Sequence, residues 1–388
     1  MPFTSSLFTK LPRNTVVLLG VDKQLELINV FWPQLKLTKE DYISEVYQAF
    51  FDFISRSLQE LQPRSNAFAA QDLPSLLAIV ETSSTERKST KEEIVVKIKP
   101  NYFNAGDAEI KRSIELGLRM WLGIHISSKE ISIGPVNSRN TRIEWPDNKT
   151  LEALVSDEFK PFPLKNAAID LPLQGSFNAV SLKRICRLQI RWTDNLADHL
   201  KLAGTRGQRS LSIYRQKICL INHRKAPGPT IIPLEILDEA IHSLDLLFPF
   251  GHSETDDFLA SEQVQLHAPH PFGLPRATEL DDFRYWRSNI AQLLLLLNGP
   301  PETVAQTLLD TRNLPQIATI WIAIFGVFFL TILFGCLSTI DTWEQAAAEL
   351  VVVLGEYAKD DEQCKYSRQI SIGQGFQGAG TADASQVP

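Results

Sequence analysis

The chain has 388 residues, of which 44% are hydrophobic and 22% are charged, and its formal net charge is −6. These values are ordinary for a globular protein, so a sizeable core can form without disulfide staples. The four cysteines lie far apart and form no CxxC pair, which excludes a zinc ribbon or thioredoxin-type motif and favours a reducing compartment.

The N-terminal segment leaves two alternatives open. Its apolar run, Val16–Val21, is six residues long, shorter than the roughly 7–15 residues of an export signal, and we interpret it as a buried strand. Lys10, Arg13 and several hydroxyls, with no acid before Asp22, are also typical of a transit peptide, which would imply a mitochondrial protein.

Three elements are expected next along the chain. Lys39–Leu61 is predicted to be a helix because its apolar residues recur every three or four positions, and Thr38 is placed to cap it. Glu92–Pro100 alternates charged and apolar residues and is predicted to be an exposed strand. Asp107–Leu122 is predicted to be a second helix.

Two tryptophan segments share a pattern. RIEWPDN spans Arg142–Asn148, QIRWTDN spans Gln189–Asn195, and a helix-like run follows each. We interpret each as a strand end that directs Ile and Trp toward the core, followed by an Asp or Asn helix cap. A remote duplication and a coincidence both explain the pattern. Further along, Pro233–Pro249 is predicted to be a helix with a proline in its first turn.

Basic residues are concentrated between Lys183 and Lys225, where eleven Lys or Arg accompany two acids. Near a bilayer such a surface fits anionic lipid headgroups or an acidic protein, whereas nucleic acid is disfavoured because no RNA-binding signature is present. A solvated face compensated by acids elsewhere in the fold is the plainest alternative. The candidate contact residues are Lys183, Arg184, Arg187, Arg191, Arg206, Arg209, Arg215 and Lys217.

The common catalytic signatures do not occur. GxSxG, HExxH and the P-loop motif are missing, and the GxGxxG at Gly373–Gly378 leaves no room for a dinucleotide-binding unit. His252, His267 and His270 lie in a proline-rich stretch that does not favour converging metal ligands. We therefore predict no catalytic, cofactor-binding or metal-binding residues. The alternative is an enzyme site assembled from scattered residues such as His199, Asp194 and Asp198.

The C-terminal third begins with a predicted helical neck at residues 279–313. It is expected to contain one helix at Leu280–Leu297 and a shorter helix at Glu302–Arg312, separated by the sequence NGPP. The five consecutive leucines Leu293–Leu297 leave no polar face, and we expect them to be buried against the globular part. A position at the bilayer interface is the alternative.

The segment Ile317–Ile340 contains 24 residues and no charge, about 36 Å of helix, which is enough to cross a hydrocarbon core of roughly 30 Å. We predict a single transmembrane helix at residues 314–340. Arg312 is the one cation within about 15 residues of either end, so the positive-inside rule places the N-terminal region in the cytosol. Residues 341–388 are expected to continue partly as helix and then to become disordered.

Four segments occur in an order that resembles a group of uncharacterised fungal proteins. They are RIEWPDN, WTDNLADHL at Trp192–Leu200, FRYWR at Phe283–Arg287 and the apolar C-terminal segment. Proteins of this group carry a WTDNLADHL segment, an FRYWR-type neck and one C-terminal transmembrane helix. The resemblance covers about residues 117–340 and implies membrane anchorage without implying any activity.

These observations predict an α+β protein with a globular region at 1–278, a helical neck at 279–313, a transmembrane helix at 314–340 and a tail at 341–388. A subdomain boundary near 62–72 or 125–140 is also compatible with the sequence. We expect a membrane-anchored, non-catalytic scaffold or recognition module at the cytosolic face of a membrane. A membrane-tethered enzyme is the alternative.

Overall fold

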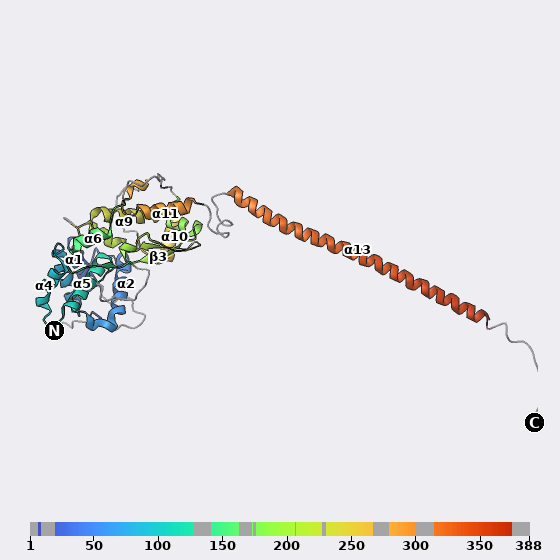
Figure 1. The fold of residues 1–388 in the computed structure, drawn as a ribbon, viewed down its shortest axis with the longest axis horizontal. Coiled ribbons are helices and arrows are strands. Elements are labelled where there is room, and N and C mark those ends of the chain that lie inside the picture. The colour runs from blue at the N-terminus through green and yellow to red at the C-terminus, as the bar shows by residue number, and fades with distance from the viewer. Residues whose placement is uncertain are drawn as a thin grey trace, which may run out of the picture. The chain divides into compact units, whose positions relative to one another are not determined.

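The computed structural model describes residues 7–8, 20–127, 141–162, 173, 176–205, 207–226, 230–266, 279–299 and 314–374. The chain divides into two units, Met1–Leu309 and Asp310–Pro388, and each is described by itself. The first unit combines many helices with two small sheets, and the second is dominated by one long helix (Figure 1). The fold is therefore mixed α and β, as the sequence predicts.

Helices form the first part of unit one. Helices α3 and α5 pack against each other at Gly117, whose missing side chain lets the backbones approach: a Cβ there would lie 2.6 Å from Val80 Cγ2. Gly123 ends α5 with a φ of +62°, a conformation that favours glycine. The helices are α1 (Val21–Phe31), α2 (Ser44–Leu61), α3 (Leu73–Thr85), α4 (Lys91–Ile98) and α5 (Asp107–Leu122).

The predicted helix Asp107–Leu122 is confirmed, and two other predictions need correction. Helix α2 begins at Ser44, because Thr38 bonds to Asp41 in the preceding turn and does not cap the helix. The predicted strand Glu92–Pro100 is wrong: it lies in helix α4 and the short 3-10 turn after it. A capping box between Thr90 and Glu93 starts α4, and its buried residues are spaced as on one face of a helix.

Two small sheets follow. Strands β1 (Ile126–Ser127) and β2 (Ile143–Glu144) pair in parallel. In the second sheet β3 (Gln189–Thr193) pairs in parallel with β5 (Gln208–Tyr214), which also pairs antiparallel with β4 (Leu202–Thr205). The two tryptophan segments thus lie in different sheets.

The helix caps after the two tryptophan segments only partly match the prediction. Thr150 caps α6, whereas Asn195 caps a single 3-10 turn, Leu196–Asp198, and not an α-helix. Pro233 lies at the N-cap of α9 and not inside its first turn. The remaining helices of unit one are α6 (Leu151–Glu158), α7 (Ala179–Ile185), α8 (Lys217–Arg224), α9 (Leu234–Leu247), α10 (Ser253–Ser261) and α11 (Arg287–Asn298).

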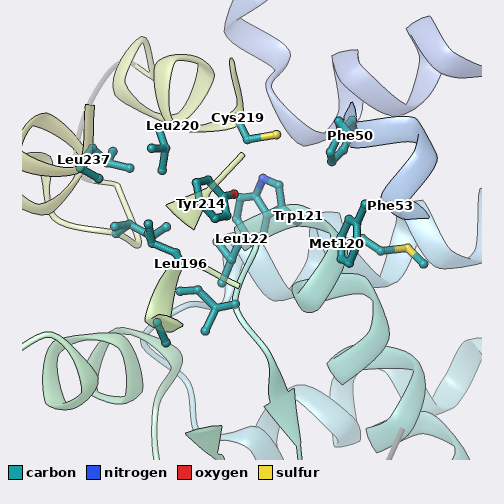
Figure 2. Close-up of a cluster of buried hydrophobic side chains, with 14 of the residues drawn as sticks. Phe50, Phe53, Met120, Trp121, Leu122, Leu196, Tyr214, Cys219, Leu220 and Leu237 are labelled. Atoms are coloured by element: carbon teal, nitrogen blue, oxygen red, sulfur yellow. The ribbon is translucent and has the colours of Figure 1, made fainter. Parts of the chain in front are cut away.

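One hydrophobic core joins these elements and extends along the chain from Leu7 to Leu297. In Figure 2, Tyr214 of β5 lies beside Trp121 and Leu122 of α5, which links the sheet to the helical part. Three of the five consecutive leucines of α11 contribute to this core, so the neck helix is packed into unit one. These three are Leu293, Leu294 and Leu297.

The second unit contains helix α13 (Leu314–Gln374), which is 61 residues long. Its stretch Ala318–Gln363 has a mean hydropathy of 2.6 in its most apolar window, and none of that window is buried. By length and composition this helix can cross a membrane. The helix also includes Lys359–Gln374, where disorder was expected. Three predictions refer wholly or partly to residues outside the described part of the chain. They are the strand that begins at residues 16–19, the helix at 302–312 and the disorder at 375–388.

Candidate functional site

The end of β3 holds a half-buried charge cluster around Asp194. The Arg215 side chain donates to both carboxylate oxygens of Asp194, from Nε at 2.6 Å and from Nη2 at 3.0 Å. Arg56 of α2 and Gln216 donate to the same carboxylate at 3.1 and 2.8 Å. The cluster therefore ties α2 to the sheet, and its carboxylate is fully engaged by donors.

Asp198 serves a second, separate network. It accepts the backbone N–H of Thr141 at 3.0 Å and the side-chain amide of Asn195 at 2.8 Å. Asn195 also accepts the backbone N–H of His125 at 3.1 Å. These bonds hold the WTDNLADHL segment against the chain that leads into β2, and they leave Asp198 no contact with the imidazole of His199.

His199 lies in the core and contacts a serine in a way that superficially resembles a catalytic pair. Its Nε2 is 2.7 Å from Ser243 Oγ, and its Nδ1 accepts the backbone N–H of Tyr214 at 3.2 Å. Because Nδ1 is the acceptor, the neutral ring carries its proton on Nε2 and donates it to Ser243. A general base would need an unprotonated nitrogen facing that hydroxyl, so this pair is not arranged as a nucleophile and its base. His199 and Ser243 are both 1% exposed, which closes the pair to substrate.

The three residues of the alternative enzyme site thus do not converge on one another. Asp194 bonds to arginines, Asp198 to backbone and amide groups, and His199 to Ser243 and Tyr214. Among the described residues, no group of three His, Cys, Asp or Glu could hold a metal ion. His252 bonds to Thr255, while residues 267 and 270 lie outside the described part of the chain.

Two of the four segments that carry the resemblance to the fungal group, WTDNLADHL and FRYWR, lie in contact. The rings of His199 and Trp286 meet edge to face with centroids 5.3 Å apart. Asn289 of α11 donates to the backbone oxygen of Leu200 at 2.9 Å. The WTDNLADHL and FRYWR segments therefore form one packed junction, in which their most distinctive side chains serve the core.

Four of the eight residues of the predicted basic contact have acidic partners. Lys183 lies 3.5 Å from Glu262, and Arg184 lies 3.3 Å from Glu254. Arg215 pairs with Asp194, and Lys217 pairs with Asp245. Arg209 has a partner of its own, and residue 206 lies outside the described residues. Arg187, two residues before β3, and Arg191, within the strand, have no partner among the described residues.

A groove of about 570 Å³ lies beside this segment, between α2 and α10. Three carboxylates line it, from Glu45, Asp52 and Asp256, together with Arg215. Because Asp194 neutralises Arg215, the net charge of the wall is negative. Such a wall disfavours an anionic headgroup, so Arg187 and Arg191 are the better candidates for an anionic contact.

Two buried charge sites could not be found from the sequence. Lys91 and Glu115 form an ion pair at 2.5 Å with both side chains 0% exposed. Glu239 of α9 accepts the backbone N–H groups of Arg284, Tyr285 and Trp286 at 2.6 to 3.0 Å. The only signal for the second site was the FRYWR segment itself.

Buried histidines make the fold sensitive to acid. Burial lowers the pKa of His199 to about 3 and that of His223 to about 4, and burial together with Arg119 and Arg142 lowers the pKa of His125 to about 3. Unfolded imidazoles titrate near 6.5. The unfolded chain therefore binds more protons below that pH, so this stability is complete above about pH 6.5 and is lost as the pH falls toward about 3.

We expect the free energy of unfolding to fall by up to about 4 kcal/mol per pH unit in the steepest part of this window, since three groups take up protons. Urea unfolding at pH 7, 6 and 5 measures this slope. Replacing His223 by glutamine should remove about a third of it. A stability that stays constant between pH 7 and 5 would contradict this account of the histidines.

Comparison of the chain with protein families, with curated proteins and with solved structures found no match.

Proposed function

We propose that this is a single-pass membrane protein whose N-terminal unit is a non-catalytic recognition module at the cytosolic face of the membrane. The observation that carries the proposal is helix α13, whose most apolar window has a mean hydropathy of 2.6 and no buried part. Each apolar side chain left in water forfeits about 1.5–3 kcal/mol of burial energy, and a bilayer recovers it. A core helix of a soluble protein would be covered by its own fold.

The non-catalytic role is supported by the hydrogen bonds and ion pairs in which the reactive side chains already take part. Asp194, Asp198 and His199 each act within a separate structural network, and the Ser243–His199 pair has the wrong proton arrangement for activating a hydroxyl. A recognition module needs only an accessible surface. A membrane-tethered enzyme would require a site outside these residues.

We place the contact with anionic headgroups, or with an acidic protein, at Arg187 and Arg191. Arg187 is exposed and lies two residues before β3, and Arg191 is half-buried within β3, an edge strand that pairs on one side only. An unpaired guanidinium can approach a phosphate without first breaking an ion pair, unlike Arg184 or Arg215. Each cation near an anionic surface contributes about 1 kcal/mol.

The test uses the full chain in lipid nanodiscs with and without phosphatidylserine, followed by hydrogen exchange. We expect the backbone around β3 to exchange several-fold more slowly in anionic nanodiscs, and the protection to vanish in high salt because the contact is electrostatic. The double variant Arg187→Glu/Arg191→Glu should lose this protection.

The matched control is Arg64→Glu/Lys160→Glu, which makes the same change in charge at two exposed cations outside the basic segment. It should keep the protection. Equal behaviour of the two double variants would show that no specific contact exists at β3. Protection that requires an acidic protein and no lipid would assign the same surface to a protein partner.

A further inference from the structure

Helix α13 continues past the predicted span with a second apolar stripe. Beyond Ile340 it runs on to Gln374, roughly 34 residues or 51 Å. Trp343, Leu350, Leu354 and Tyr357 lie on this part and are 58% to 75% exposed. With Ala347 they follow one another at intervals of four, three, four and three residues, which is the a/d spacing of a coiled coil. This stripe requires a partner.

The polar side of the same helix is acidic. Asp341, Glu349 and Glu356 fall at the outward b and c positions of that heptad, whereas the exposed Val351, Val352 and Val353 fall at e, f and g and widen the apolar side of the helix. Helices that lie on membrane surfaces carry Lys and Arg on the polar face, so this composition disfavours an anionic bilayer surface. The helix is also unbroken from Leu314 to Gln374, with no bend that would lay its second half on the membrane.

The N-terminal unit of the same chain cannot cover the stripe, and this step rests on the proposed function. Unit one precedes the span and the stripe follows it. If α13 crosses the bilayer, the two therefore lie on opposite sides of the membrane. The apolar residues must be covered by something on the far side.

A second copy of this chain can cover the apolar stripe on the far side of the membrane. Two copies inserted in the same direction are parallel and at the same depth, so their identical stripes face each other at the same height. Insertion also confines them, which raises their effective concentration and compensates for the short contact. We infer that α13 forms a parallel two-stranded coiled coil from Ile340 to Tyr357.

Charges mark the end of this contact. Asp361 takes the next a position and stops the apolar stripe. Asp360, just before it, falls at a g position and Lys365, four residues after it, at the following e position, where g and e residues of neighbouring helices form ion pairs. Within its own helix Lys365 lies 3.4 Å from Asp361 in an exposed i,i+4 pair, which is weak enough to exchange for a partner across the interface. The opposite signs of Asp360 and Lys365 fit a parallel arrangement of two identical helices.

The test is site-specific oxidative cross-linking of the full chain in sealed vesicles. Single cysteines replace Leu350 at a d position or Gln345 at an outward f position, in a background with Cys336→Ser and Cys364→Ser. The background protein without either new cysteine sets the baseline for Cys186 and Cys219. After oxidation we expect the disulfide-linked dimer of Leu350→Cys to exceed that of Gln345→Cys by about tenfold or more.

Alkaline extraction before cross-linking tests the proposed membrane anchorage separately from the proposed coiled coil. If alkali releases the chain from the vesicles, the proposed membrane anchorage fails. If the chain resists extraction and Leu350→Cys yields no more dimer than Gln345→Cys, the anchorage stands and the coiled coil is overturned.

Discussion

Replacing Lys91 by methionine should lower the free energy of unfolding by about 3–5 kcal/mol, the cost of leaving a buried charge without its partner. Lys91 begins α4, and its Nζ lies 2.5 Å from Glu115 Oε1 on α5 and 3.3 Å from the backbone oxygen of Trp145. The ammonium also lies 5.3 Å from the centroid of the Trp145 ring. Without Lys91, the Glu115 carboxylate must either stay ionised in the core or take up a proton.

The matched control removes both charges. Lys91→Met/Glu115→Leu replaces the pair by apolar side chains, and such replacements are often neutral or stabilising. We expect the double variant to recover most of the stability lost in Lys91→Met. Urea unfolding of the full chain in detergent, followed by near-ultraviolet circular dichroism, measures both. A single variant as stable as the wild type would show that the pair does not hold α4 on α5.

Replacing Glu239 by alanine should release helix α11 from the core. The carboxylate accepts three successive backbone N–H groups at the start of α11, and an unsatisfied buried N–H costs about 1–3 kcal/mol. With the anchor lost, we expect the hydrogen exchange of residues 284–297 to accelerate by two orders of magnitude or more, because Leu293, Leu294 and Leu297 would leave the core together.

Glu235→Ala provides the comparison, since Glu235 lies one turn earlier on α9 and is exposed. Exchange in α11 should stay at the wild-type rate in that variant. If Glu239→Ala also leaves exchange unchanged, the FRYWR segment is held by its aromatic packing and not by the carboxylate.

The local sequence pattern predicted an element correctly where its apolar spacing and its end residues indicate the same structure. Helix α5 has a clear apolar period and a glycine stop at Gly123, and it forms where expected. Helix α4 was mistaken for a strand because a run as short as EEIVVKI fits both periods, and only the Thr90–Glu93 capping box separates them. The apolar part of α13 was predictable because no charge interrupts it.

Contacts between distant residues explain what the sequence did not reveal. Lys183, Arg184 and Lys217 look like a basic surface in the linear sequence, but their acidic partners come from α9, α10 and the residue after α10. Glu239 and the backbone it holds are separated by 45 to 47 residues. Residue types and their spacing in the sequence do not indicate which distant residues pair. The resemblance to the fungal group stays a prediction.

Protease protection on sealed vesicles, with a tag at each end of the full chain, tests the central claim most directly. We predict that protease added outside digests the N-terminal tag and leaves the C-terminal tag intact, with α13 recovered as the protected fragment. Protection of the N-terminal tag, accompanied by glycosylation of Asn148 in the acceptor sequence Asn148-Lys149-Thr150, would invert the orientation and remove the cytosolic recognition surface. Digestion of both tags, with no protected fragment, would contradict the membrane-spanning role of α13.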